Sequence, residues 1–277
     1  MRGRLKKERR DTDLAVVGDE VEIERGDDGS GVVAAVLERR SVFSRLHPTS
    51  RGRAIEDVLV ANLDRVLLVF SAGSPPMNPR LVDRFLVVAE HNRIEPVVVA
   101  TKIDDESAHD ARDRFARFEE VGHAVLFTSA RTGEGIDALR SMLEGGVSAL
   151  TGPSGVGKSS LLNAVQPGLQ LQVGDVSDAL RKGMHTTRVA ELHALEGGGF
   201  VADTPGIREL AGFAIPARDL ARCFRDLRPF VEGCAFGDCL HDTEPGCAVR
   251  EAADSGLVRS DRYDSYLRQL RGEDLRG

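Results

Sequence analysis

The segment 152–159, which reads GPSGVGKS, restricts what this chain can fold into more than any other stretch. It matches the pattern G-x-x-x-x-G-K-[ST], follows the apolar stretch 147–151, and precedes residues 159–165, whose leucines have helical spacing. Such a loop cradles phosphate, because its glycines turn backbone N–H groups toward an anion and the next helix adds its positive end. A glycine-rich turn without a ligand is the alternative that the pattern alone leaves open.

The side chains of this loop have separate predicted tasks. Lys158 would reach the β- and γ-phosphates of a nucleotide, and Ser159 would offer its hydroxyl to Mg²⁺. Lys158 is also a candidate catalytic residue, because its charge would stabilise the transferring phosphoryl group. The residues expected to bind nucleotide here are Gly152, Pro153, Ser154, Gly155, Val156, Gly157, Lys158, Ser159 and Ser160.

Length and composition narrow the class of protein. With 277 residues the chain is long enough for two or three domains, and 41% hydrophobic with 29% charged residues is typical of a globular protein. We expect a cytoplasmic monomer that contacts no membrane, since no apolar run is long enough to span one and the basic start lacks the apolar core of a secretory signal. Six of the first ten residues are Arg or Lys, so this start could contact phosphate or could simply be solvated.

The order of predicted elements divides the chain. Residues 16–23 and 31–37 have the alternation of short strands, whereas the polar stretch 41–53 has no clear period and is predicted to be a long loop. From residue 58 onward, apolar strands at 65–70, 96–100 and 124–127 alternate with helices at 79–90 and 109–121. This alternation predicts a parallel sheet with helices on both faces and a ligand at the carboxyl ends of its strands.

Two motifs at such strand ends predict which base is bound. Thr101, Lys102 and Asp104 fit the pattern [NT]-K-x-D, in which the aspartate accepts hydrogen bonds from N1 and N2 of guanine while the lysine stem packs on the base. Adenine lacks this pair of donors, so guanine is favoured. The dipeptide Ser129-Ala130, about one strand and helix further on, resembles the loop that binds guanine O6 in enzymes with this base motif.

Magnesium and γ-phosphate contacts are expected downstream of the phosphate loop. A strand at 199–203 leads into the pattern D-x-x-G, in which Asp203 would hold a water of Mg²⁺ and the Gly206 N–H would sense the γ-phosphate. Between the two motifs, Thr187 is the predicted second protein ligand of Mg²⁺ beside Ser159, with its neighbour Thr186 as the alternate. Base motifs therefore precede the phosphate loop, which is a circular permutation of the usual GTPase order.

In this order of motifs the chain resembles the RsgA (YjeQ) family of GTPases, and the match extends to residues 61–64 and to the cysteine segment. The resemblance implies GTP hydrolysis to GDP and phosphate, stimulated by the small ribosomal subunit and serving its late maturation, with ribosomal RNA as a contact. It assigns the orientation of the attacking water to His185, because Ile207 stands where many GTPases have a glutamine. An incidental surface histidine is the alternative for His185.

Three of the four cysteines, together with one histidine, predict a metal site near the C-terminus. Cys234, Cys239, His241 and Cys247 form a Cys₃His set that suits one structural Zn²⁺ per chain. A disulfide framework is the competing reading, but it belongs to secreted chains and leaves His241 unexplained. Cys223 lies on a helix predicted at 217–230 and is expected to be a core residue.

These observations predict an α/β protein of three parts. They are an OB-type β domain over residues 1–57, a circularly permuted P-loop GTPase domain over 58–213, and a helical zinc-binding domain over 214–277. The family resemblance implies residues ahead of segment 2–7 that supply the first barrel strands, so we expect the OB-type domain to be truncated. A GTP-gated RNA-binding factor with negligible hydrolysis is the rival from another class, and an ATPase or nucleotide kinase is disfavoured by Asp104.

Overall fold

A six-stranded sheet forms the centre of the protein in the computed structural model, which describes residues 15–48, 54–169, 191–203 and 215–273. Five strands are parallel and one edge strand, β9, is antiparallel to its neighbour. The spatial order is β7 (Ala124–Phe127), β6 (Glu95–Thr101), β5 (Arg65–Ser71), β8 (Val147–Thr151), β10 (Phe200–Asp203) and β9 (Glu191–Ala194). The central strands β5 and β6 are buried along nearly their whole length, as apolar runs covered on both faces require.

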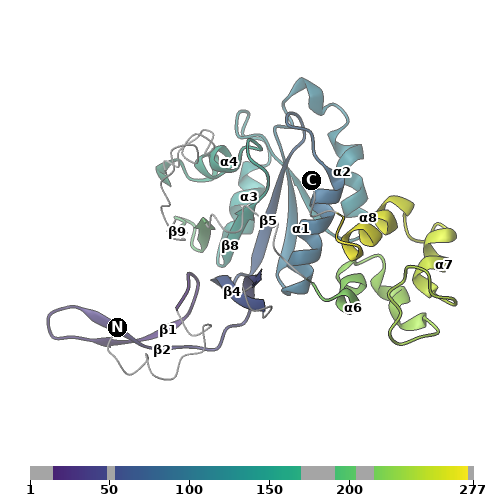
Figure 1. Ribbon diagram of the computed structural model, residues 1–277. Coiled ribbons are helices and arrows are strands. Elements are labelled where there is room, and N and C mark those ends of the chain that lie inside the picture. Colours follow the sequence, from purple (N-terminus) through teal and green to yellow (C-terminus); the bar gives the residue numbers. More distant parts are fainter. Residues whose placement is uncertain (1–14, 49–53, 170–190, 204–214, 274–277) are drawn as a thin grey trace.

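Helices cover the two faces of this sheet (Figure 1). On one side lie α1 (Pro79–His91), the short helix η1 (Glu106–Ala108) and α2 (Ala111–Glu119), and on the other lie α3 (Ile136–Leu143), α4 (Lys158–Val165) and the short helix η2 (Pro167–Leu169). Neighbouring residues of β5 point to opposite faces, so Leu68 belongs to the core under α1 while Leu67 belongs to the core under α3 and α4. The predicted α/β architecture is confirmed.

The N-terminal part of the described chain consists of two hairpins. Strands β1 (Val21–Arg25) and β2 (Gly31–Val36) form an arm, while β3 (Val42–Pro48) and β4 (Ala54–Ala61) pair next to the sheet domain. The prediction of a loop throughout 41–53 was therefore wrong for 42–48. A register shift between Phe43 and Ser44 explains the missing period, because it buries both neighbours and interrupts the alternation that marks a strand.

The C-terminal region is built from short helices around a small core of its own. The elements are α6 (Ala217–Leu220), η5 (Ala221–Cys223), η6 (Arg228–Gly233), α7 (Ala248–Asp254) and α8 (Ser260–Leu270). The continuous helix predicted over 217–230 was wrong, because Phe224 has extended backbone angles and ends the first helical segment. This break lets the Phe224 ring meet Tyr266 edge to face at 5.7 Å in the middle of the core. Cys223 is buried in the same core, as predicted.

The outer face of α1 carries the C-terminal region. Four contact residues recur there at intervals of three or four, which places them on one side of the helix: Arg80, Asp83, Val87 and Glu90. Asp83 is fully buried and pairs with the equally buried Arg262 of α8. Arg262 also forms a two-pronged ion pair with Asp226, at 3.1 Å from Nε and 2.8 Å from Nη2. The α1 face thus fixes α8 against the sheet domain.

None of the helices in the described ranges combines the length and the hydropathy that crossing a bilayer requires. The proposed borders at 57/58 and 213/214 remain predictions. Strand β4 passes across the first border, and its residue Val60 packs in the core of the sheet domain.

Candidate functional sites

The predicted base motif and the phosphate loop lie together at the carboxyl edge of the sheet. Thr101, the last residue of β6, donates its Oγ1 hydroxyl to the carbonyl oxygen of Val156 in the phosphate loop at 2.6 Å, and the carbonyl oxygen of Phe70 lies at 3.3 Å as a second acceptor for the same hydrogen. Thr101 is only 4% exposed, so these hydrogen bonds are shielded from water. The threonine therefore ties the base motif to the phosphate loop through its hydroxyl.

Lys102 connects three loops at the same edge. Its backbone has a φ of 57°, which turns the chain out of β6 directly after the strand. The Nζ atom donates to the carbonyl oxygens of Ser74 at 2.6 Å and Gly155 at 2.7 Å. These contacts hold the lysine stem between the loop after β5 and the phosphate loop.

Asp104 has a carboxylate held from two sides. Ser129 donates its hydroxyl to Oδ1 at 2.5 Å, and Arg131 donates from Nε to Oδ2. These hydrogen bonds, that of Ser129 first, lower the pKa of Asp104 below its ordinary value. The group is therefore an acceptor at neutral pH, as recognition of guanine N1–H and N2–H requires. Arg131 was not among the site residues predicted from sequence, although it directly follows Ser129-Ala130.

The phosphate loop approaches the sheet backbone so closely that glycine is required. A Cβ atom on Gly152, whose φ is 145°, would lie 2.0 Å from the carbonyl oxygen of Val69. Gly157, with a φ of 97°, immediately precedes the first residue of α4. Lys158 donates from Nζ to the carbonyl oxygens of Gly152 at 2.7 Å and Pro153 at 2.6 Å, so its ammonium group lies over the loop. Ser159 and Ser160 follow in the first turn of α4 and are half-buried.

The four predicted metal ligands converge in the C-terminal region. The ligand atoms of Cys234, Cys239, His241 and Cys247 all lie within 4.8 Å of one another. The His241 Nδ1 atom is 3.3 Å from Sγ of Cys234 and 3.5 Å from Sγ of Cys247. A tetrahedral Zn²⁺ with bonds of about 2.3 Å to sulfur and 2.0 Å to nitrogen would separate its ligand atoms by about 3.5–3.8 Å. Donor set and spacing therefore fit a four-coordinate metal ion.

Backbone and side-chain contacts hold the metal-binding loop in shape. The Glu244 carboxylate accepts the N–H groups of Leu240 at 2.8 Å, Asp242 at 2.9 Å and Thr243 at 3.1 Å. From α8, Tyr263 and Tyr266 donate their hydroxyls at 2.6 Å to the carbonyl oxygens of His241 and Leu240. The two tyrosine hydrogen bonds therefore connect the metal-binding loop to α8, the helix that docks on α1. Such outer contacts fix the orientation of metal ligands.

Comparison with known proteins identifies the family. A family model described as RsgA GTPase matches residues 36–212. The chain belongs to the RsgA GTPase family. It is 48% identical over 275 residues to a Gemmatimonas aurantiaca protein named small ribosomal subunit biogenesis GTPase RsgA, covering 99% of this chain and 89% of that relative. A protein of the same name from Caldanaerobacter subterraneus is 40% identical, with 95% of this chain and 85% of the relative covered.

Solved structures bear out the permuted order of this RsgA-family chain. The crystal structure of YjeQ from Thermotoga maritima matches with a TM-score of 0.78 and 35% identity, over 98% of this chain and 87% of that one. A structure titled YloQ, a circularly permuted GTPase, matches with a TM-score of 0.71 and 30% identity, over 97% of this chain and 84% of that one. The family and the circularly permuted GTPase fold predicted from the order of motifs are confirmed.

Part of the predicted site of this RsgA-family protein lies outside the described residues. These positions are His185, Thr186, Thr187 and Gly206. Asp203 is the last residue of β10, and the register that pairs Ala202 with Ala149 of β8 brings it to the sheet edge from which the phosphate loop leaves. Ala130 is exposed directly after Ser129, at the end of β7. The structure thus brings together the base motif and the phosphate loop.

Proposed function

We propose that this RsgA-family GTPase hydrolyses GTP to GDP and phosphate and acts, as a cytoplasmic monomer, in late maturation of the small ribosomal subunit, which stimulates it. The observation that carries the proposal is the junction of the base motif with the phosphate loop through Thr101 and Lys102. The names of the relatives support the choice of the small subunit.

Guanine selection would depend on Asp104. Its ionised carboxylate presents two acceptor oxygens, and the hydrogen bond from Ser129 fixes the orientation of the group. Guanine offers two donors to such a carboxylate, whereas adenine in the same position would leave an acceptor unpaired, at a cost of about 1–3 kcal/mol. Ala130 and the stem of Lys102 would line the remaining sides of the base.

Hydrolysis would rest on positioning and charge. The backbone N–H groups of the phosphate loop and the Lys158 ammonium would hold the β- and γ-phosphates and stabilise the charge that develops as the phosphoryl group transfers. Mg²⁺, when bound, supplies further neutralisation of phosphate charge, and Ser159, Asp203 and Thr187, or Thr186 in its place, would hold it. We assign the orientation of the attacking water to His185 and the contact with the γ-phosphate to the Gly206 N–H.

The Cys₃His cluster would hold one structural Zn²⁺. All four positions of a tetrahedral site are taken by Cys234, Cys239, His241 and Cys247, which leaves none open for a substrate. The ion would stabilise a helical domain, proposed to span 214–277, that contacts ribosomal RNA beside the GTPase domain at 58–213 and the OB-type domain at 1–57.

A direct test measures GTP hydrolysis by the full chain alone, with small ribosomal subunits and with large ones. Strong stimulation by small subunits only is expected. A rate that small subunits leave unchanged would contradict the proposed function.

The base pocket has its own test in Asp104→Asn. The amide has one donor and one acceptor, so the variant should lose GTP affinity by about one to two orders of magnitude and gain affinity for xanthosine nucleotides. The neighbouring Asp105→Asn is the matched control, because Asp105 caps the short helix 106–108 through its bond to the Ser107 N–H. Unchanged GTP affinity and continued rejection of xanthosine nucleotides in Asp104→Asn would refute the pocket assignment.

A further inference from the structure

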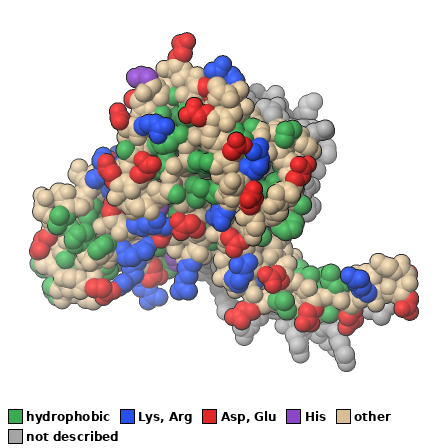
Figure 2. Space-filling model, turned by 180° about the vertical axis from the view of Figure 1, so that it is seen from behind, with side chains coloured by type: hydrophobic (Ala, Val, Ile, Leu, Met, Phe, Trp, Pro, Cys, Tyr) green, Lys and Arg blue, Asp and Glu red, His purple; other side chains and the backbone are tan. Residues whose placement is uncertain are grey.

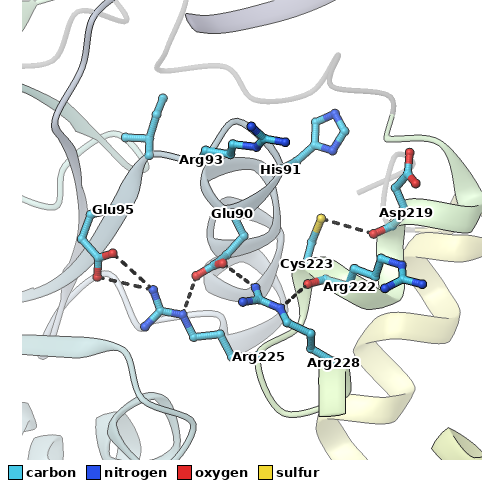
Figure 3. A pocket seen from close by; sticks show the side chains of 10 residues that line it. Glu90, His91, Arg93, Glu95, Asp219, Arg222, Cys223, Arg225 and Arg228 are labelled. Atoms are coloured by element: carbon cyan, nitrogen blue, oxygen red, sulfur yellow. Dashed lines mark hydrogen bonds and ion pairs between the residues drawn. The ribbon is translucent and has the colours of Figure 1, made fainter. Parts of the chain in front are cut away.

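A charged groove lies where the C-terminal region meets the amino edge of the sheet, away from the nucleotide site at the carboxyl edge. It has a volume of about 450 Å³ and is formed by the end of α1, the start of β6 and the segment 219–228. Figure 3 shows the side chains of Arg93 and His91 along one rim and those of Arg225 and Arg228 along the opposite one. Both parts of the protein therefore contribute cationic groups to the same space.

Two arginines of the groove are fixed by one carboxylate. Glu90, near the end of α1, accepts Nε of Arg225 at 2.5 Å and Nη2 of Arg228 at 2.6 Å. Arg225 also bonds to the carbonyl oxygen of Gly122 and reaches Glu95 at 3.4 Å. The acidic groups beside these guanidiniums are thus already engaged, and the guanidiniums are held without further loss of side-chain freedom.

Two further arginines on the rims remain available to a ligand. The Arg93 side chain is exposed and makes no hydrogen bond or ion pair with any residue in the described ranges. Arg222 pairs at 2.6 Å with Glu232, whose side chain is 77% exposed. Because such a solvated pair contributes little, a stronger anion can replace it.

Arginines outnumber carboxylates along the groove, where Arg93, Arg222, Arg225 and Arg228 face Glu90, Glu95 and Asp219. His123 is 3% exposed, and burial, followed by the charges of Arg225, Arg262 and Arg228, lowers its pKa to about 3. Figure 2 shows Lys and Arg side chains gathered along the underside of the molecule, where the C-terminal region joins the sheet domain.

We propose that this groove binds a backbone phosphate of RNA, with Arg93 of the sheet domain and Arg222 of the C-terminal region donating to it from the two sides of the seam. Guanidinium groups suit phosphate oxygens in charge and geometry. Among the described residues that line the groove, His91 is the single aromatic side chain and there is no Phe, Tyr or Trp, so the contact is expected to read the backbone more than the bases. Cationic groups on both rims favour an extended polyanion. The proposal rests on the proposed function for its source of RNA.

The test compares full-length wild type with Arg93→Ala/Arg222→Ala in binding to purified small ribosomal subunits over a range of salt concentrations. The control is Arg25→Ala/Arg112→Ala, which removes the same charge from the tip of the β1–β2 hairpin and from the exposed side of α2. The groove variant should bind about tenfold more weakly, with a log–log salt slope smaller by about 0.7–0.9 for the lost phosphate contact. Its GTP affinity and metal content should equal those of wild type.

Each outcome has one meaning. Affinity and slope equal to those of the control variant, with wild type binding normally, would overturn the groove and leave the proposed function intact. Failure of wild type itself to bind or respond to small subunits would count against the proposed function. In a parallel arm, inorganic phosphate is titrated against thermal unfolding. Stabilisation of wild type alone, with unchanged subunit binding by the groove variant, would identify a free-phosphate site and overturn the RNA assignment.

Discussion

The two ends of the described chain flank the same sheet domain but attach to it in different ways. The C-terminal region buries Arg262 against Asp83 of α1 and shares Val87 with its own core. The β1–β2 arm is joined mainly by hydrogen bonds at its base, where Ala61 donates to Val17 at 2.9 Å and the Asn62 amide donates to Gly18 at 2.9 Å. In Figure 1 the arm extends from the body, whereas the C-terminal helices lie against α1.

The two modes of attachment differ in how much they bury, and this decides how freely each region can move. Ile23 on the arm remains 58% exposed, whereas Tyr266 in the C-terminal core is fully buried. A region with a buried core and buried charges can hold only one orientation, while an arm held by a few backbone contacts can change its angle at small cost. Charge differs as well, since residues 19–28 of the arm contain six acidic residues and one arginine. This described part of the arm therefore suits RNA less well than the seam does.

Among the changes that test this contrast, loss of a metal ligand should have the largest effect on the stability of the C-terminal region. Cys239→Ser should release the metal ion and unfold the C-terminal region, because apparent binding energies of structural zinc reach about 10–16 kcal/mol and the region's core is small. The sheet domain should still bind GTP. Metal analysis and circular dichroism measure the two effects, and Cys223→Ser, outside the cluster, is the control. Metal-free wild type purified without chelator would contradict the prediction.

The second largest loss of stability is expected for Arg262→Ala. It leaves Asp83 with only its longer ion pair to Arg117 at 3.8 Å, removes the partner of Asp226, and should lower the free energy of unfolding by about 3–5 kcal/mol. Denaturant unfolding measures the loss. Arg268→Ala on the same helix, whose side chain is 37% exposed, should cost less than about 1 kcal/mol. Equal effects of the two substitutions would mean that the buried pair does not hold the seam.

The seam should also be sensitive to acid through His123. Its pKa is lowered to about 3 in the folded protein, so the unfolded chain binds the extra proton first as pH falls below the ordinary value of 6.5. Stability is fully present above pH 6.5 and declines toward pH 3, by about 1.4 kcal/mol per unit and about 2 kcal/mol by pH 5. His123→Leu should flatten this decline in denaturant unfolding. An unchanged pH profile would contradict it.

The arm should show the smallest effect on global stability and the largest on local motion. Asn62→Gly tolerates the φ of 56° but loses the bonds to Gly18 and to the Arg40 N–H, which should cost about 1–2 kcal/mol. Amide exchange should accelerate in residues 16–36 and stay unchanged in 234–247. Equal acceleration in both segments would show that the two ends are coupled and would contradict their different modes of attachment.

Sequence alone predicted the residues whose chemistry has a fixed local spacing. The phosphate loop, the [NT]-K-x-D motif and the Cys₃His set could be found because a phosphate, a guanine edge or a metal ion requires particular side chains at particular intervals. Strands such as 65–70 and helix 79–90 were also predictable, since each carries its own hydrophobic period.

Only the tertiary structure decided how these parts are joined. Asp83 and Glu90 look like solvated charges on an amphipathic helix, and their partners Arg262 and Arg225 lie more than a hundred residues away. The strand at 42–48 was hidden because its register shift removes the alternation, and the helix at 217–230 was interrupted because burying the Phe224 ring required an extended backbone. Local patterns record what a segment can form by itself. Pairing and burial between distant segments decide what it forms in the fold.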